Sequence, residues 1–148
     1  MKLTRVVLLS VLFITLFAVT AGAMPNVVWP GDGGNTSGLI VITKPPKDRS
    51  ATFDRSYVIS GYGKEGTVVA IYKLSGDVYV KTNYEWQIGA STYFAIPIEL
   101  DSKKNILLCR AEDSSGQYQH AKLEITYLGS SLSDVVRNIT VDATSIPY

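Results

Sequence analysis

The sequence has only one cysteine and one histidine, and this scarcity restricts the chemistry open to the chain. With Cys109 alone, no disulfide can form within the chain, so stability must come from packing. Cys109 and His120 together cannot supply the three or four ligands of a usual zinc centre. Asp101, Glu112 and Asp113 come nearest to a calcium set, but calcium needs more oxygens than they offer. We therefore expect no metal, no cofactor and a buried, unreactive Cys109 thiol.

The sequence also has few candidates for catalysis. An enzyme needs a nucleophile with a base, a carboxylate pair or a metal set. His120 lies at an outward position of the last long alternating segment, so we expect an exposed histidine on a sheet. The prediction is a protein that is not an enzyme. A small enzyme or inhibitor with an unrecognised active loop remains a rival, which convergent polar groups around His120 or Glu112 would favour.

Neither positive nor negative charge is in large excess, since the sequence has 14 basic and 13 acidic residues. Removal of residues 1–23 would take away Lys2 and Arg5 but no acid, which changes the formal net charge from +1 to −1. A nearly neutral surface does not attract polyanions in general. We therefore expect no nucleic acid among the partners.

Long apolar runs are confined to the beginning of the sequence. Lys2 and Arg5 precede the apolar residues 6–19, and residues 21–23 read Ala-Gly-Ala. This is the pattern of a secretory signal peptide, with cleavage expected after Ala23. An uncleaved anchor is the alternative, and a membrane is an expected partner only in that case. The predicted location is secreted or at the extracellular cell surface.

Three segments follow the signal peptide. Residues 24–38 are rich in glycine and proline and read as a flexible N-terminal arm. Residues 39–128 contain the expected strands and form the predicted domain. Residues 129–148 are a C-terminal tail, in which Leu132, Val135, Val136 and Ile139 have helical spacing, so a short amphipathic helix and a frayed tail both remain open.

Strict alternation of apolar residues is the strongest structural signal in the chain. It runs through Phe94, Ile96, Ile98 and Leu100, through Leu107, Cys109 and Ala111, and through Ala121, Leu123, Ile125 and Tyr127. This period of two puts each set on one face of a strand. Strands are expected at 39–43, 57–61, 67–74, 78–82, 92–100, 105–112 and 118–128, with a further segment at 84–88. Such spacing, without helices between strands, predicts an all-β antiparallel sandwich.

The order of these residues resembles bacterial immunoglobulin-like modules, the repeats of bacterial cell-surface and secreted proteins. The matching positions are Gly61, Gly66, Val69, Ile71, Phe94, Ile96, Ile98, Leu100, Asn105, Leu107, Cys109, Ala111, Asp113 and Gly116. The resemblance covers residues 40–128 and is most specific over 105–116. It implies an immunoglobulin-like antiparallel β-sandwich of about seven strands.

The chain departs from this family at three turns. The family commonly has a glycine two residues before the aromatic position that Phe94 occupies here, but this chain has Thr92 at that place. Lys103 and Lys104 occupy a turn that often holds glycine, and Gln117 replaces an asparagine. These departures affect the turn types rather than the sandwich.

Several of the matching residues have physical roles that do not depend on the family. Gly61 falls where a side chain would point inward, and the glycines at 66 and 116 suit tight turns. Phe94 is expected to be the central core residue. Asp113 is expected to accept hydrogen bonds from nearby backbone N–H groups in its turn. Asn105 belongs to the same set of structural positions.

The function predicted from these observations is a non-catalytic module for adhesion, spacing or protein binding at the bacterial cell surface. Its expected partner is an extracellular protein or another cell-surface component. The alternative is a carbohydrate-binding module, because aromatic rings on an exposed sheet can stack on sugars. The candidate platform for that alternative consists of Tyr79, Tyr84, Trp86 and Tyr93.

Overall fold

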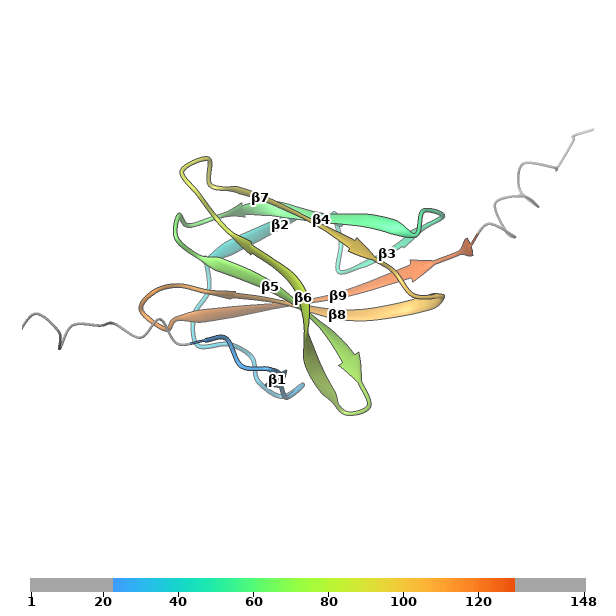
Figure 1. The fold of residues 1–148 in the computed structure, drawn as a ribbon, viewed down its shortest axis with the longest axis horizontal. Helices are drawn as coiled ribbons and strands as arrows, with labels where there is room; N and C mark the ends of the chain where they lie inside the picture. The colour runs from blue at the N-terminus through green and yellow to red at the C-terminus, as the bar shows by residue number, and fades with distance from the viewer. Residues whose placement is uncertain (1–22, 130–148) are drawn as a thin grey trace, which may run out of the picture.

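The computed structural model describes residues 23–129, which form two β-sheets stacked as two layers (Figure 1). The strands are β1 (Val27–Val28), β2 (Ile40–Lys44), β3 (Arg49–Thr52), β4 (Ser56–Gly63), β5 (Val68–Ser75), β6 (Val78–Gln87), β7 (Tyr93–Glu99), β8 (Lys103–Glu112) and β9 (Tyr118–Tyr127). For these residues the all-β prediction is confirmed. The expected signal peptide and C-terminal tail lie outside the described residues, apart from Ala23 and Gly129.

The two sheets differ in size. The smaller has the strand order β2-β4-β7 and the larger the order β1-β6-β5-β8-β9-β3. Neighbouring strands are antiparallel except β3 and β9, which run parallel. The short strands β1 and β3 were not expected from the sequence, because neither carries an alternating run long enough to be recognised.

The main core lies between the two sheets and contains most of the residues that the alternation predicted, together with the consecutive pair Leu39 and Ile40, while Ala121 and Tyr127 are only partly buried. Its buried members are Leu39, Ile40, Ile59, Val69, Ile71, Ile88, Phe94, Ile96, Ile98, Leu100, Leu107, Cys109, Ala111, Leu123 and Ile125. Every second residue of β7, β8 and β9 therefore faces the opposite sheet, as the period of two requires. Burial raises the pKa of the Cys109 thiol to about 12, in keeping with the expected unreactive cysteine.

Phe94 and Gly61 occupy the centre of the smaller sheet. Phe94 is fully buried, and it lies opposite Gly61 in the pairing of β4 with β7. A Cβ atom at Gly61 would overlap the carbonyl oxygen of Val41 and would lie 3.0 Å from Cε1 of Phe94. The glycine is therefore needed for the close approach of β2 and the Phe94 ring.

Asn105 closes the turn between β7 and β8 from inside the protein. Its Oδ1 accepts a hydrogen bond from the Asp101 N–H at 2.8 Å. Its Nδ2 donates to the carbonyl oxygens of Asp101 and Ile125 at 3.1 and 3.2 Å. The buried amide thus ties this turn to β9, which supports the structural role expected for Asn105.

Strand β6 replaces the two segments expected at 78–82 and 84–88. Its pairing with β5 shifts between Ala70 and Tyr72, where β6 has extra residues. The Thr82 hydroxyl donates to the Ile71 carbonyl at 2.6 Å and so satisfies a group that the bulge leaves unpaired. Beyond the bulge, the Tyr84 hydroxyl accepts the Glu99 N–H at 3.1 Å, which links β6 to the smaller sheet.

The turns at Thr92 and Lys103 have strained backbone. Their φ angles are +57° and +70°, a region that L-residues with side chains avoid. Both lie where the resemblance in the sequence calls for glycine. At the expected turn glycines Gly66 and Gly116, φ is +81° and +79°. Thr92 and Lys103 therefore adopt the left-handed conformation that glycine takes at Gly66 and Gly116.

Replacing Thr92 with glycine should stabilise the protein. Relief of a left-handed conformation is worth roughly 1–2 kcal/mol, and the added freedom of glycine in the unfolded chain costs roughly 0.5–1 kcal/mol. We expect Thr92→Gly to raise the free energy of unfolding by about 0.5–1 kcal/mol in urea denaturation. Thr92→Ala is the control, because it keeps most of the strain and should gain much less. A loss of stability in Thr92→Gly would contradict the strain.

Candidate functional site

The N-terminal arm, residues 24–38, lies along the outer face of the larger sheet, on the side away from β2, β4 and β7 (Figure 1). The Tyr72 hydroxyl donates to the Pro25 carbonyl at 2.7 Å. The Lys81 N–H donates to the Asn26 carbonyl at 2.9 Å, next to the pairing of β1 with β6. The flexible, exposed arm that the composition suggests is therefore docked in the structure.

The arm docks because the outer face beneath it is apolar. Val28 is buried there in a second cluster. The other buried members of this cluster are Ala70, Tyr72, Tyr79 and Leu108. The sequence indicates that this outer face is covered, because β5 and β8 are apolar at consecutive positions rather than at alternate ones. Strands of that kind have both faces covered.

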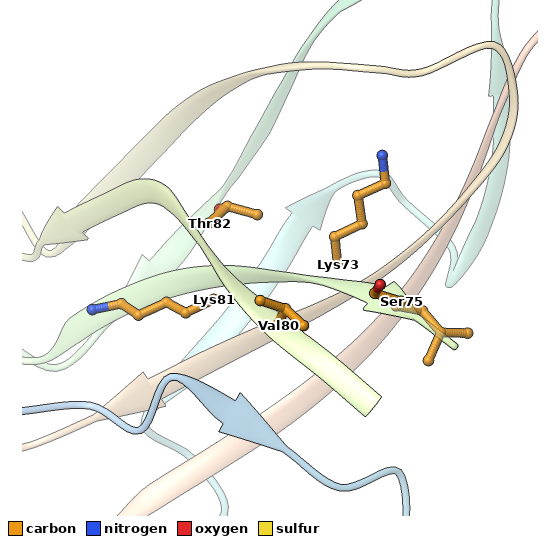
Figure 2. Close-up of a pocket in the computed structure, with 6 residues that line it drawn as sticks. Lys73, Ser75, Val80, Lys81 and Thr82 are labelled. Carbon is orange, nitrogen blue, oxygen red and sulfur yellow. The ribbon is translucent and has the colours of Figure 1, made fainter. Parts of the chain in front are cut away.

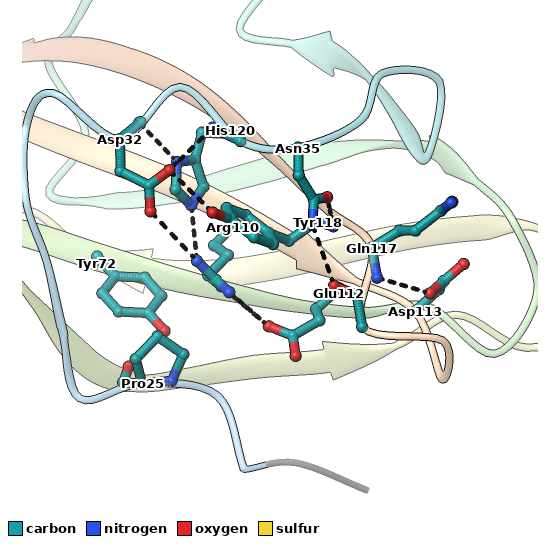
Figure 3. A network of polar contacts seen from close by, with 12 residues as sticks. Pro25, Asp32, Asn35, Tyr72, Arg110, Glu112, Asp113, Gln117, Tyr118 and His120 are labelled. Carbon is teal, nitrogen blue, oxygen red and sulfur yellow. Dashed lines mark hydrogen bonds and ion pairs between the residues drawn. The ribbon is translucent and has the colours of Figure 1, made fainter.

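Beside this cluster, a network of charged side chains joins the arm to β8 and β9 (Figure 3). The side chain of Arg110 is only 7% exposed, and it donates to Glu112 Oε2 from Nε at 3.1 Å and from Nη2 at 2.8 Å. Its guanidinium carbon lies 4.0 Å from the centre of the Tyr118 ring. Arg110 is thus held by a carboxylate and an aromatic ring at once, which compensates the burial of its charge.

The tautomer of His120 follows from its two neighbours. Its Nδ1 lies 3.0 Å from the Asp32 carbonyl oxygen, and its Nε2 lies 3.1 Å from Nη1 of Arg110. A carbonyl only accepts and a guanidinium only donates, so these contacts assign the donor role to Nδ1 and the acceptor role to Nε2. The ring points to the outer face, as its parity predicts, but the arm leaves only 3% of the side chain exposed. The expectation of an exposed histidine was wrong for this reason.

Asp32 is the charged residue that the arm contributes to this network. Its Oδ1 accepts hydrogen bonds from Gly34 N–H at 3.1 Å and Tyr118 OH at 3.2 Å, and its Oδ2 lies 4.0 Å from Nη1 of Arg110. Burial raises the pKa of Asp32, but these donors and the guanidinium outweigh it and leave that pKa below its ordinary value. The bond to Asp32 is also the main reason that the pKa of Tyr118 is raised.

Polar groups do converge around His120 and Glu112, which is the arrangement that would favour a small enzyme or inhibitor. Here the groups bond mainly to one another, and the arm lies over them. Arg110 and His120 are nearly inaccessible. The geometry therefore fits a clamp that holds the arm on the sheet.

The four aromatic residues of the expected carbohydrate platform do not lie together. Tyr79 is buried under the arm on the outer face of the larger sheet. Tyr84 packs against the main core. Trp86 and Tyr93 are exposed, but they belong to β6 and β7 in different sheets. The sequence could not show this, because it does not reveal which strands are neighbours.

A different set of exposed residues forms a row across the outer face of the smaller sheet. Val41 lies opposite Tyr62 in the pairing of β2 with β4, and Tyr62 lies opposite Tyr93 in the pairing of β4 with β7. Their exposed fractions are 62%, 54% and 42%. The Tyr62 and Tyr93 rings are 5.5 Å apart and meet edge to face at 64°. We call Val41, Tyr62 and Tyr93 the exposed row.

Of this row, only Tyr93 is among the candidate residues expected from the sequence. The outward parity of Val41 and Tyr62 could be read from their positions next to the inward residues Ile42 and Gly61. Their assembly into a row depends on the register of β2, β4 and β7. Register is decided by pairing in three dimensions.

A groove of about 390 Å³ lies along the hairpin of β5 and β6 (Figure 2). Its lining residues are Lys73, Leu74, Ser75, Val80, Lys81 and Thr82. The ammonium groups of Lys73 and Lys81 point away from each other, toward Asp101 and Glu85, with which they form ion pairs. The groove therefore lacks the convergent polar groups of a ligand site.

Two features are absent from residues 23–129. No group of three or more histidine, cysteine, aspartate or glutamate side chains in this range is placed to hold a metal ion. No helix in the same range is both long and apolar enough to cross a membrane.

Comparison with known proteins gives little guidance. No family model and no curated protein matches the chain. Among solved structures, CopC from Methylosinus trichosporium OB3b is similar over 61% of this chain and 94% of its own, with 15% sequence identity and a TM-score of 0.41. A likeness this distant assigns neither a family nor a ligand to this chain.

Loss of the Asp32 carboxylate should loosen the arm. Asp32→Ala removes the acceptor of two hydrogen bonds and one partner of Arg110, so we expect the free energy of unfolding to fall by about 1–2 kcal/mol. In the folded protein, hydrogen exchange should quicken at the Lys81 amide, which bonds to the arm. Asp54→Ala, at an exposed carboxylate between β3 and β4, is the control. If the Lys81 amide exchanges at the same rate in both variants, Asp32 does not hold the arm on the sheet.

Asp113 is held in the turn between β8 and β9, as expected. Its Oδ1 accepts from the Ser115 hydroxyl at 2.6 Å and from the N–H groups of Ser115 and Gln117 at 2.9 and 3.2 Å. Lys64 Nζ lies 3.2 Å from Oδ2. The Ser115 hydroxyl is the main cause that lowers the pKa of Asp113 to about 2, and the backbone N–H groups and Lys64 add to it.

A lowered pKa in the folded state predicts a specific pH dependence. The stabilisation from ionised Asp113 is complete above the ordinary aspartate pKa of about 3.9. It is lost as the pH falls to about 2. Asp113→Asn should therefore be less stable than the wild type at pH 6, and the two urea midpoints should converge between pH 4 and pH 2. A difference that stays constant over this range would contradict the role of the charge.

Proposed function

We propose that the chain is an exported, immunoglobulin-like module that binds a protein partner through its exposed row and catalyses no reaction. Its order of strands supports the immunoglobulin-like part of this proposal. In the seven-stranded constant-type sandwich the first, second, fourth and fifth strands form one sheet and the third, sixth and seventh form the other, and variable-type domains place extra strands beside the third. With β2 counted first and the short β1 and β3 left aside, β2-β4-β7 corresponds to the first, second and fifth strands, and β5-β8-β9 to the third, sixth and seventh. The fourth strand, β6, lies beside the third, where variable-type domains have their extra strands.

The observation that carries the binding function is the exposed row itself. Large apolar side chains that stand together on a surface often mark an interaction site. Tyrosine is enriched at protein interfaces, because it buries a large ring and can still hydrogen-bond through its hydroxyl. Val41, Tyr62 and Tyr93 are all more than two-fifths exposed and lie on neighbouring strands.

The sheet beneath the row supports binding at low cost in entropy. The opposite sides of β4 and β7 pack into the main core through Ile59, Phe94 and Ile96. The backbone that carries the row is thus fixed before a partner arrives, and a tyrosine has only two side-chain torsions to lose. Adhesion and spacing are the roles that a rigid module of this kind can serve.

The signal peptide expected at residues 1–23 supports export, and places the partner among secreted or cell-surface proteins. The angle of 64° between the Tyr62 and Tyr93 rings does not support a flat stacking surface for sugars. A protein partner therefore suits the row better than a carbohydrate.

Site-specific photocrosslinking tests the proposal. The full chain is produced in its source cells with benzoylphenylalanine in place of Tyr62 or Tyr93, and the cells are irradiated. We expect each position to give a discrete protein adduct, because both side chains would lie in the interface. The control is the same amino acid in place of Trp29, an aromatic residue that is 68% exposed on the arm. The absence of adducts at 62 and 93, or equal adducts at 29, would overturn the proposal.

A further inference from the structure

We infer that the clamp on the arm opens in mild acid, because a second proton on the His120 ring breaks its contact with Arg110. The clamp consists of Asp32 from the arm, Arg110 and Glu112 from β8, and Tyr118 and His120 from β9. His120 is the only histidine of the sequence, and histidine is the side chain that ordinarily changes its charge between about pH 5 and pH 8. The clamp lies on the layer opposite the exposed row, so this inference does not depend on the proposed binding function.

The His120 ring is enclosed by groups with fixed hydrogen-bond roles, as Figure 3 shows. Its Nδ1 lies 3.0 Å from the carbonyl oxygen of Asp32, and its Nε2 lies 3.1 Å from Nη1 of Arg110. Arg110 is directly opposite His120 in the pairing of β8 with β9, so the two side chains share one face of the sheet. With 3% of the His120 side chain exposed, bulk water does not replace either contact while the arm is in place.

A proton on Nε2 would reverse the role of that nitrogen. The guanidinium of Arg110 only donates, and it keeps its charge throughout this pH range. Two N–H groups and two positive charges would therefore face each other across 3.1 Å. Such a contact is relieved by displacement of the His120 ring or of the Arg110 guanidinium.

The two carboxylates of the clamp do not remove this conflict. Oδ1 of Asp32 lies 4.0 Å from Nδ1 of His120, where it attracts a charged ring but offers no acceptor to Nε2. Glu112 Oε2 accepts two hydrogen bonds from Arg110, so its charge is already engaged by the guanidinium. Lys122 lies two residues beyond His120 on the same face of β9 and adds a further positive charge.

The remaining titratable groups around the ring keep their state in mild acid. The centre of the Tyr118 ring lies 5.3 Å from that of His120, and the pKa of Tyr118 is raised, mainly by its bond to Asp32. Burial raises the pKa of Tyr72, the tyrosine of β5 on this face, to about 12. Both hydroxyls therefore stay protonated. The pKa of Asp32 lies below its ordinary value, so this carboxylate stays ionised.

Displacement of His120 or Arg110 loosens the arm because both side chains contact Asp32. His120 binds the Asp32 carbonyl, and Nη1 of Arg110 lies 4.0 Å from Oδ2. The apolar burial of Val28 does not change with protonation. The arm would therefore open from the end that carries Asp32, while the end that carries Val28 stays on the sheet.

Amide hydrogen exchange of the exported chain tests this inference. The Asn35 N–H donates to the Tyr118 carbonyl at 3.0 Å and so reports on the clamped end of the arm. The Ile88 N–H donates to the Thr67 carbonyl at 2.9 Å and is the internal reference. Between pH 7 and pH 5, we expect the protection factor of Asn35, corrected for the intrinsic effect of pH, to fall by roughly tenfold, while that of Ile88 stays constant.

His120→Gln is the control, because glutamine can both donate and accept in place of the ring but does not titrate. In this variant the protection of Asn35 should not depend on pH. The nitrogen-15 shifts of the His120 ring in the wild type give a readout that needs no variant. They should show Nε2 without a proton at pH 7, and a protonation midpoint equal to that of the loss of Asn35 protection. Constant protection in the wild type, an equal loss in His120→Gln or different midpoints would overturn the inference.

Discussion

The structure depends on the burial of both faces of β5 and β8. On the inner face, Val69 and Leu107 pack against the smaller sheet, and on the outer face Tyr72 and Leu108 are equally buried. Two neighbouring strands without a polar side need cover on each side. The smaller sheet provides one cover and the N-terminal arm provides the other. The arm is therefore part of the folded domain.

The arm is held by two kinds of contact that act side by side. Val28 supplies apolar burial, which holds an extended chain without defining its position closely. Asp32 supplies directional contacts to Tyr118 and, at longer range, to Arg110, and its carbonyl accepts from His120. Buried charges of this sort cost free energy unless each is paired. Here the pairing also positions the arm, which explains why so polar a network lies next to an apolar cluster.

This division leaves the molecule with two different surfaces. The outer face of the larger sheet is closed by the chain itself, and its ionisable groups are used in closing it. The outer face of the smaller sheet carries Val41, Tyr62 and Tyr93 in a row and is open. The proposed binding function follows from this asymmetry. It ascribes interaction to the open face and leaves the buried network a structural role.

The sequence by itself determined the β class, most residues of the main core including Phe94, and the turn contacts of Asp113. These depend on local alternation and on turn chemistry, which act over a few residues. Only the tertiary structure decided that the arm docks, that His120 is buried and that Tyr62 joins Val41 and Tyr93, while Tyr79, Tyr84 and Trp86 lie apart from them. These outcomes depend on which strands are neighbours and in what register. That is settled by contacts between residues far apart in the chain, which the local pattern does not record.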